Sequence, residues 1–426
     1  MKENKFNKIE QSINEFWLEN NNNKFDINNP IVRLHEPTFN SEEIIAFTKQ
    51  MLTTNVTMGP KVKEFEKKYS SLYGYKYGVS NNSGSSANLL MLSALTSSIT
   101  ENNLKKGDEI ILPALTWSTT VWPVIQCGLV PVYIDCELDT FNMDPSKIEE
   151  AISSKTKAVF SVPIYGNPCN MDEILSICEK NNLMLIEDCC ESMGATYKGK
   201  SVGSFGRVGS FSFYYSHHIT TLEGGICVTD DFELAEMMRI IRAHGWVRQV
   251  EDREKWTKKY PDFDPKFLFV NEGYNLRITE PQASMGLIQI DKLNEFVEKR
   301  ISNAANYKKS FNKYSDFFSF QETTNGSKNS HFGFPFVVKK NKYFNRDEIC
   351  EYLNKNGIET RPIIAGNIAR QPANSLFEHR IPGNLKNSDN IMDNGFSIGV
   401  HQSLCKESMN YVKLVFDNFF KERMVN

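Results

Sequence analysis

Short apolar runs rich in β-branched residues alternate with longer segments of helical periodicity from residue 41 onward. The runs predict strands over 76–80, 108–113, 130–135, 157–166 and 183–188, and the periodic segments predict helices over 61–74, 87–98 and 171–182. Each predicted strand leads into a loop of polar or small residues. This alternation is typical of an α/β domain with a mainly parallel sheet, in which ligands bind at the carboxyl ends of the strands.

The two ends of the chain have patterns of their own. The N-terminal segment is polar and asparagine-rich, with a patch from Asn20 to Asn23 and one amphipathic helix expected around Ile9 to Leu18. Helical periodicity returns over 232–246 and 278–311, and a mixed pattern follows, with a strand expected over 331–340 and a helix over 345–357. We therefore expect a polar arm at 1–35, a large domain at 36–288 and a small C-terminal domain at 289–426.

The charge and the apolar content of the chain indicate what kind of partner the protein binds and in which cellular compartment it acts. The chain has 49 Lys and Arg against 52 Asp and Glu, and no basic stripe that would indicate nucleic acid. The first 30 residues have no apolar core of signal-peptide type, and no later run approaches the ~20 apolar residues of a membrane span. Nine cysteines are scattered without the pairing of a disulfide scaffold. We expect a cytoplasmic, soluble protein that acts on a small molecule, with no membrane partner.

Two loops that follow predicted strands carry groups suited to an anion and to an aromatic ring. Ser83, Gly84, Ser85 and Ser86 open a helix, whose first N–H groups and positive dipole end suit a phosphate, although serine caps and glycine turns are equally ordinary at such a position. Trp117 follows the strand at 108–113. Its indole is either packing or a flat platform for a ring.

A carboxylate ends the buried strand at 183–188. Asp188 should face a positive charge, because an unpaired buried carboxylate is costly. An arginine would be the ordinary partner, and a protonated ring nitrogen of a cofactor is the alternative. Cys189 and Cys190 point to opposite sides of an extended chain and make a poor metal site.

Two adjacent histidines, His217 and His218, stand in "FYYSHHITTLEGG". Neighbours in an extended segment point apart, and the spacing that places two histidines on one metal ion is absent, so we expect no metal here. A buried structural histidine is one interpretation, most naturally for His218. The other is that one imidazole moves a proton.

Set in chain order, these motifs resemble the DegT/DnrJ/EryC1/StrS sugar aminotransferases, from "NSGSSANLLMLSAL" through "IEDCCESMGATYKGK" to "GYNLRITEPQASMGLIQ". The resemblance implies an aspartate-aminotransferase-like (type I) fold, with a mainly parallel seven-stranded sheet in a large domain and a smaller α+β domain. It also implies pyridoxal or pyridoxamine phosphate as cofactor, and a homodimer with shared active sites.

The resemblance assigns roles to individual residues. Gly84, Ser85, Ser86 and Ser212 would bind the cofactor phosphate, Trp117 would stack on the ring, and Asp188 would hold the ring nitrogen protonated. Asn275 would reach the phosphate of the neighbouring subunit's cofactor. Glu191 falls where many relatives have Gln or His beside the ring.

The departure from the family that matters most is at position 217. His217 stands where the aminotransferases have the lysine that binds the cofactor aldehyde, so the cofactor should be held non-covalently. A branch with this histidine, the nucleotide-sugar 3-dehydratases, is also similar in "GIETRPIIAGNIARQPA". The substitution implies removal of the C3 hydroxyl of a nucleotide-linked 4-keto-6-deoxy sugar, a GDP-linked hexose or heptose, with His217 as acid–base residue. The product would be a 3,6-dideoxy-4-keto sugar for lipopolysaccharide or capsule synthesis, and ammonia is released, with L-glutamate restoring the amine.

One variant of that branch carries an iron–sulfur cluster. This chain has no cysteine between Cys227 and Cys350, where the cluster ligands would be expected, and four thiolates are required. We therefore expect no iron–sulfur cluster and no other metal. Two alternatives stay open: a nucleotide-sugar 4-aminotransferase adapted to histidine, and a noncatalytic cofactor- or nucleotide-sugar-binding homologue. The presence of Ser85, Trp117, Asp188 and Asn275 together argues against a decayed site.

Overall fold

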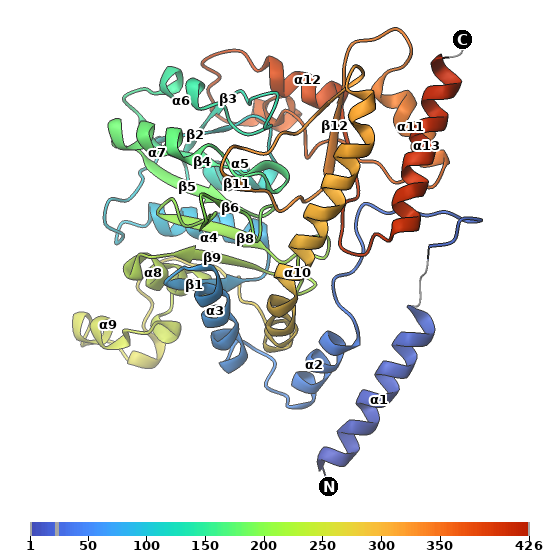
Figure 1. Ribbon diagram of the computed structural model, residues 1–426. Helices are drawn as coiled ribbons and strands as arrows, with labels where there is room; N and C mark the ends of the chain where they lie inside the picture. The colour runs from blue at the N-terminus through green and yellow to red at the C-terminus, as the bar shows by residue number, and fades with distance from the viewer. Residues whose placement is uncertain (1, 22–24, 425–426) are drawn as a thin grey trace.

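The five strands predicted between residues 76 and 188 join two further strands, β8 and β9, in one seven-stranded sheet, ordered β1-β9-β8-β5-β4-β2-β3 (Figure 1). The computed structural model describes residues 2–21 and 25–424. The pairs from β3 across to β8 are parallel, and β9 is antiparallel to both of its neighbours, which confirms the expected mainly parallel sheet. The strands are β1 (Tyr77–Asn81), β2 (Glu109–Pro113), β3 (Val130–Ile134), β4 (Thr156–Ser161), β5 (Met184–Asp188), β8 (Val208–Ser212) and β9 (Gly225–Thr229).

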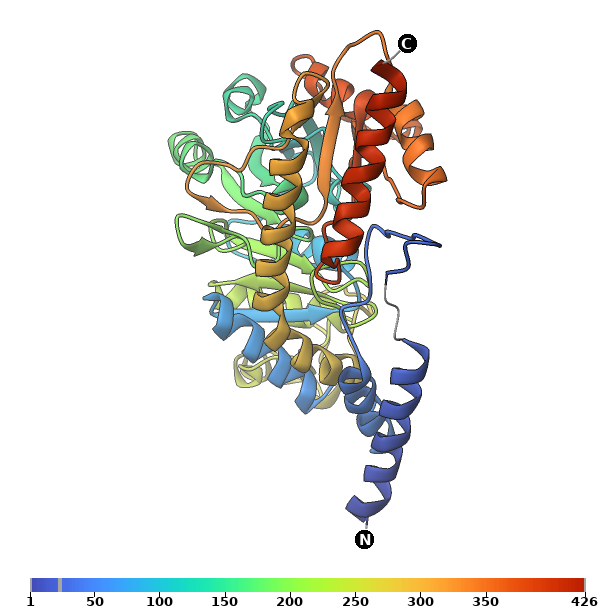
Figure 2. The same cartoon turned by 45° about the vertical axis from the view of Figure 1, so that its right-hand side comes forward.

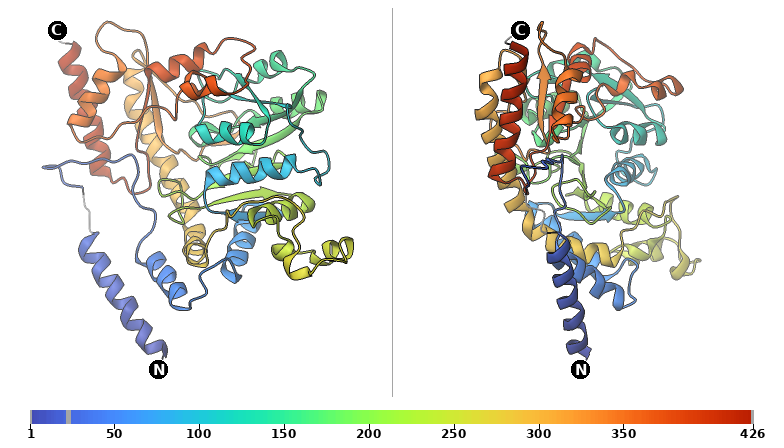
Figure 3. Two further views of the ribbon diagram at one scale, coloured as in Figure 1. Left: turned by 180° about the vertical axis from the view of Figure 1, so that it is seen from behind. Right: turned by 90° about the vertical axis from the view of Figure 1, so that its right-hand side faces the viewer.

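Helices cover both faces of this sheet, so its strands are apolar on both sides (Figure 3). Along β2, Ile110 and Leu112 belong to one apolar cluster and Ile111 to another, as the alternation of side chains in a strand requires. The first cluster includes α4 (Gly84–Thr96), α5 (Ser118–Gln126) and α8 (Phe232–Arg242). The opposite face is covered by α3 (Pro60–Tyr73), α6 (Pro145–Ala151), α7 (Met171–Lys180) and α10 (Glu280–Phe311).

A second, antiparallel sheet lies toward the C-terminus. It consists of β10 (Phe318–Phe320), β12 (Phe334–Val338) and β13 (Gly395–Ile398), and packs with α11 (Arg346–Lys355) and α13 (Lys406–Met424) around a phenylalanine-rich core. The rings of Phe336 and Phe396 stack across it, with centroids 4.9 Å apart. The boundary expected between 288 and 289 falls inside α10, which flanks both sheets, so the division into two domains stays a proposal.

Shorter elements complete the fold. A small sheet joins β6 (Thr196–Tyr197), β7 (Lys200–Ser201) and β11 (Ser327–Lys328). The remaining α-helices are α9 (Arg253–Lys259) and α12 (Lys386–Asn394), together with α1 (Lys2–Asn20) and α2 (Ser41–Leu52) near the N-terminus. None of the helices in residues 2–21 and 25–424 has the length and apolar content needed to cross a bilayer.

The N-terminal helix α1 contacts α2 and projects away from the two sheets (Figures 1 and 2). It contains the helix expected around Ile9 to Leu18. Residues 22 and 23 of the asparagine patch lie outside the described residues.

Two predicted elements end well before their patterns suggested, whereas the others differ by only a residue or two at that end. The helix expected over 232–246 stops at Arg242, because His244 and Gly245 have φ values of +67° and +78°, which a helix cannot contain. The strand expected over 157–166 stops at Ser161, and Tyr165, with φ at +56°, turns the chain at the carboxyl end of β4. This turn brings Tyr165 beside the candidate site.

Candidate active site

A cavity of about 440 Å³ lies at the carboxyl ends of β2, β5 and β8, where an α/β sheet binds its ligands. Of the predicted site residues, all except Ser86 and Asn275 line it. The lining consists of Ser83, Gly84, Ser85, Thr116, Trp117, Thr119, Thr120, Val162, Asp188, Cys190, Glu191, Ser212, Tyr214, Ser216, His217, Glu223, Phe332, Arg361 and Ile364. Loops far apart in sequence therefore meet at one point, as the strand pattern predicted.

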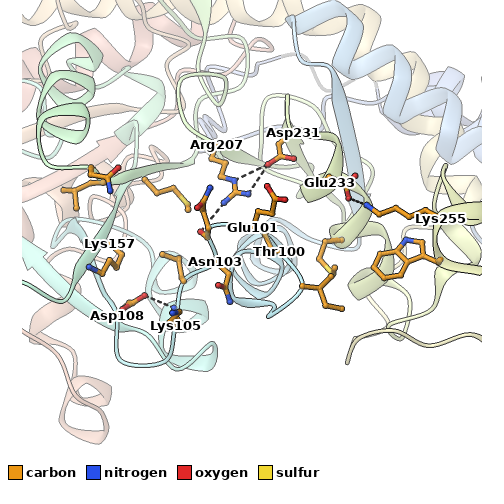
Figure 4. Close-up of a pocket in the computed structure, with 18 of the residues that line it drawn as sticks. Thr100, Glu101, Asn103, Lys105, Asp108, Lys157, Arg207, Asp231, Glu233 and Lys255 are labelled. Carbon is orange, nitrogen blue, oxygen red and sulfur yellow. Dashed lines mark hydrogen bonds and ion pairs between the residues drawn. The ribbon is translucent and has the colours of Figure 1, made fainter. Parts of the chain in front are cut away.

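A larger cavity, of about 970 Å³, opens at the other end of the sheet (Figure 4). Its lining includes residues that precede or begin strands, such as Asp108, Lys157 and Arg207. Charged side chains there pair with one another: Arg207 with Asp231 at 3.1 Å, and Lys255 with Glu233. In each of these ion pairs the two charges cancel, and no predicted site residue lines this cavity. The larger cavity is therefore not the candidate active site.

The N-terminus of α4 forms a cradle for an anion. The first N–H groups of a helix have no partner within the helix, and here Ser83 Oγ accepts only that of Ser86, at 3.0 Å. The N–H groups of Gly84 and Ser85 therefore stay available at the cavity wall, opposite Ser212. A Cβ at position 84 would lie 2.5 Å from the Cβ of Ser212, so only glycine fits between α4 and β8.

Ser86 is the predicted phosphate ligand that the structure places differently. Its N–H and its hydroxyl both bond to Ser83 Oγ, each at 3.0 Å, and it does not line the cavity. A role for Ser86 in phosphate binding stays a prediction, whereas its capping of α4 is observed.

Asp188 ends β5 with its carboxylate buried in the cavity wall, and the residue is 5% exposed. Asn88 Nδ2 and Thr120 Oγ1 each donate to Oδ2 at 2.7 Å, and the N–H of Cys190 donates to Oδ1 at 3.2 Å. Within the described chain no lysine or arginine pairs with this carboxylate. The ordinary interpretation, a salt bridge to arginine, is therefore not observed within the described chain, and the carboxylate is free to face a cationic ligand atom.

Trp117 precedes α5 and presents a 46% exposed indole to the cavity. The guanidinium of Arg361 lies 5.7 Å from the centroid of its ring. Arg361 is the only lysine or arginine in the lining given above, and within residues 2–21 and 25–424 it forms no ion pair. Reasoning from the sequence missed Arg361, although it stands within the segment "GIETRPIIAGNIARQPA" that was singled out as a whole.

Glu191 follows β5 by three residues and accepts the N–H of Tyr165 at 3.2 Å. Burial raises the pKa of its carboxyl to about 7, and the negative charge of Asp188 acts in the same direction, while the Tyr165 N–H and Arg361 oppose them. Near neutral pH this group therefore exists in both protonation states and can give or take a proton.

His217 lies in the loop after β8, with its imidazole between two aromatic rings. The centroids of Phe332 and Tyr214 are 5.0 and 5.9 Å away, and both rings meet the imidazole edge to face. Burial, together with the positive charges of Arg300 and Arg361, lowers the pKa of His217 to about 3. The imidazole is therefore neutral at working pH, the form that accepts a proton, and its buried Nδ1 has no partner in the described part of the protein.

His218 points away from the cavity, as expected for neighbours in an extended segment. It is fully buried, and its Nε2 lies 3.1 Å from the carbonyl oxygen of Ser330. That contact requires a proton on Nε2. The two adjacent histidines therefore occupy separate environments.

Asn275 lies outside this cavity. It is exposed, its backbone pairs with that of Ala243, and its Oδ1 accepts a hydrogen bond from Arg277 Nε at 2.9 Å. Nothing in its own chain uses its amide N–H₂ group among the described contacts.

The cavity fits a phosphorylated pyridine. Two free N–H groups and a serine hydroxyl provide for a phosphate, Trp117 offers a flat face, and Asp188 is a buried carboxylate that lacks a cation. No lysine lines the cavity, so within the described residues the site has no amine to bind an aldehyde covalently.

Comparison with known proteins gives the same picture. The model of the DegT/DnrJ/EryC1/StrS aminotransferase family matches residues 37–416. The GDP-4-keto-6-deoxy-D-mannose 3-dehydratase of Escherichia coli O55:H7 is 39% identical over 385 residues, which cover 90% of this chain and 98% of that protein. The lipopolysaccharide biosynthesis protein RfbH of Salmonella typhimurium is 39% identical over 391 residues, covering 89% of this chain and 90% of its own length.

Solved structures agree in fold along most of the chain. An E. coli GDP-4-keto-6-deoxy-D-mannose-3-dehydratase with bound hydrated PLP superposes with a TM-score of 0.85 at 39% identity, covering 90% of this chain and 98% of that one. A GDP-4-keto-6-deoxymannose-3-dehydratase with a trapped PLP-glutamate geminal diamine gives 0.83 at 38% identity, covering 90% and 99%. The predicted type I fold is confirmed.

Proposed function

Because the chain belongs to the DegT/DnrJ/EryC1/StrS aminotransferase family, we propose that it is a dehydratase dependent on pyridoxamine and pyridoxal phosphate. It removes the C3 hydroxyl of a GDP-linked 4-keto-6-deoxy sugar, a hexose or heptose, and yields a 3,6-dideoxy-4-keto sugar and ammonia. L-Glutamate restores the amine. The relative named for lipopolysaccharide biosynthesis supports a role in surface polysaccharide synthesis, and we propose that the protein acts in the cytoplasm.

One observation carries this proposal: His217 lines the cavity, and by its resemblance to the family the chain has this histidine where the aminotransferases have their lysine. A lysine there captures the cofactor covalently and returns it to amino transfer. An imidazole cannot form that bond but can move protons.

Five residues of the cavity lining have a task in this reaction. When bound, pyridoxamine phosphate supplies an amino group for the sugar carbonyl and a ring that takes up an electron pair. Gly84, Ser85 and Ser212 would hold the phosphate, and Asp188 would keep a proton on the ring nitrogen. The neutral imidazole of His217 takes a proton from carbon and returns it to the hydroxyl that leaves C3.

A product assay tests the proposal. The protein is incubated with pyridoxal phosphate, glutamate and a panel of GDP- and CDP-linked 4-keto-6-deoxy sugars, while ammonia release and product mass are followed. We expect ammonia, 2-ketoglutarate and a sugar that has lost one oxygen, from a GDP-linked substrate. A 4-amino sugar formed without ammonia would identify an aminotransferase instead, and no turnover of any sugar would favour a binding protein.

Arg361 provides a prediction about the amino donor. Glutamate brings an α-carboxylate one bond from its reacting carbon, whereas the diphosphate of the sugar nucleotide lies across the sugar ring. Arg361, the only lysine or arginine of the cavity lining, lies over the Trp117 ring that would stack on the cofactor, so we assign it to the α-carboxylate. We expect R361M to raise the KM for glutamate at least about tenfold, in line with the loss of one charge-assisted pair.

Stopped-flow absorbance separates the two half-reactions in this variant. R361K keeps the charge and should show a smaller rise in KM for glutamate. If R361M instead raises the KM for the GDP-sugar in single turnovers of protein preloaded with pyridoxamine phosphate, the arginine serves the diphosphate and the assignment is wrong.

The position of Asn275 leads to a prediction about assembly. Because it is exposed and outside its own cavity, we propose that it completes the cofactor site of a second subunit in a homodimer. N275A should then weaken cofactor affinity about tenfold, the effect of one lost hydrogen bond to a charged phosphate.

Mixed dimers test this sharing. N275A and H217N chains, each of low activity alone at limiting cofactor, are denatured together and refolded. Hybrids contain one site with both native residues, so activity should rise above the sum of the separate samples. Activity that does not exceed that sum would place Asn275 outside the partner's site.

A further inference from the structure

Arg300, in the middle of α10, is a buried cation without a counter-ion. The residue is 1% exposed. Its Nη1 donates to the carbonyl oxygens of His331 and Phe332, each at 3.2 Å, and Nη2 donates to Gln402 Oε1 at 3.4 Å. Nε has no partner, and no carboxylate of the described residues forms an ion pair with this guanidinium. A buried charge without compensation is costly, so its presence calls for a reason.

Histidines surround this charge. The chain has seven histidines, and Arg300 acts on five of them, His35, His217, His218, His331 and His401. Burial lowers the pKa of each, and the positive charge of Arg300 lowers it further, to about 4 for His331 and about 3 for His217 and His401. The Nδ1 atoms of His217, His218 and His401 are buried without a partner. His217, His331 and His401 are thus neutral imidazoles at working pH, and all three are affected by one fixed cation.

The segment that Arg300 holds is the one that touches both central histidines. Phe332, whose carbonyl oxygen accepts from Arg300, lines the cavity and places its ring 5.0 Å from the imidazole of His217. Ser330, two residues before it, accepts from His218. The guanidinium therefore ties α10 to the segment whose Phe332 ring packs against the imidazole.

We propose that Arg300 is a positioning residue for His217: it fixes Phe332 against the imidazole and places a permanent positive charge behind it. The inference rests on the proposed role of His217 as the proton acceptor. A cation near an imidazole disfavours a second proton on the ring, so the charge of Arg300 keeps His217 in its neutral form before the reaction, although it also makes the imidazole a weaker base. A carboxylate beside Arg300 would cancel this effect.

Other charged groups face His217 as well. Arg361 acts in the same direction as Arg300, and His35 adds to it whenever it is protonated. The acidic groups that share the cavity wall with His217 are Asp188, Glu191 and Glu223. Arg300 differs from all of these because it is fully buried and bonded to the backbone beside the imidazole.

Two substitutions at position 300 separate charge from hydrogen bonding. R300Q removes the positive charge but keeps an N–H₂ group that can donate to a carbonyl oxygen. R300K keeps the charge but loses the planar guanidinium, which donates to two carbonyl oxygens at once. The protonation of His217 is followed by ¹⁵N–¹H correlation spectra of histidine-labelled protein prepared without cofactor, and its signal is assigned by its absence in H217N. Removal of a unit charge within roughly 10 Å should raise the pH at which His217 is half protonated by about one unit or more.

We expect partial protonation of His217 at pH 5 in R300Q, and none in R300K or the unchanged protein. A folded R300Q whose His217 remains neutral at pH 5 like that of R300K would overturn the inference. Because this measurement uses protein without cofactor or sugar, it stands even if the proposed reaction is not found.

Phe332 provides the second variant, should R300Q fail to fold. F332L leaves Arg300 and its bonds to the backbone in place but removes the ring that supports the imidazole. We expect about a tenfold lower rate of dehydration in single turnovers, with unaltered affinity for pyridoxamine phosphate, as misplacement of a catalytic group by a fraction of an ångström produces. A native rate in F332L would refute the positioning role.

Discussion

H217N is expected to abolish dehydration while the cofactor stays bound. An amide of similar size cannot accept or give a proton at working pH, and loss of a general acid–base group costs about 10²–10⁴ in rate. The phosphate cradle at α4, the indole of Trp117 and the carboxylate of Asp188 are all independent of this side chain. Single turnovers of protein loaded with pyridoxamine phosphate, followed by ammonia release, measure the loss, and absorbance after dialysis measures cofactor retention.

The neighbouring histidine is a matched control. H218N removes an imidazole from the same segment, but one that faces Ser330 and lies outside the cavity. It should lower the melting temperature by a few degrees, because a buried hydrogen bond is lost, and should reduce the dehydration rate far less than H217N. An equal loss of dehydration rate in the two variants, or full activity in H217N, would show that His217 is not the acid–base residue.

H217K is expected to convert the site from non-covalent to covalent cofactor binding. A lysine needs its neutral amine to attack an aldehyde. The environment that lowers the pKa of His217, namely burial and the charges of Arg300 and Arg361, would act in the same direction on an amine at this position. We therefore expect pyridoxal phosphate to attach to the protein, with a new visible absorbance band and a mass increase after borohydride reduction. Dehydration should fall to the level of H217N.

The H217K variant also tests whether position 217 faces the cofactor aldehyde. With its amine in place, H217K should retain the cofactor through dialysis better than the unchanged protein. A chain that shows no band and no added mass after reduction, although folded and loaded, would mean that position 217 does not face the cofactor aldehyde. H218K, from the neighbouring position outside the cavity, should show neither signal and controls for reaction at other lysines.

The sequence predicted those site residues that lie directly at the end of a strand or at the start of a helix. Asp188 closes an apolar strand, and Gly84 and Ser85 open a helix, so the chain itself places them at one edge of the sheet. Arg361 and Phe332 have no such marker. They come from segments beyond α10 and reach the cavity only through packing between the two sheets.

Ser86 and Asn275 were predicted as site residues, but neither lines the cavity. The motif around Ser86 is the same whether its hydroxyl caps the helix or faces a phosphate, and only the bond to Ser83 distinguishes these possibilities. Asn275 lies outside its own cavity, and a pattern within one chain cannot tell which subunit a loop serves.

The sequence by itself determined the α/β class, the order of the strands along the chain and the replacement that defines the chemistry, since periodicity, strand ends and the identity of residue 217 are local properties. Only the tertiary structure decided that His217 is a neutral imidazole. Its charge state depends on burial and on Arg300 and Arg361, which lie 83 and 144 positions further along the chain. Electrostatic interactions act through space, and the fold alone brings such distant residues together.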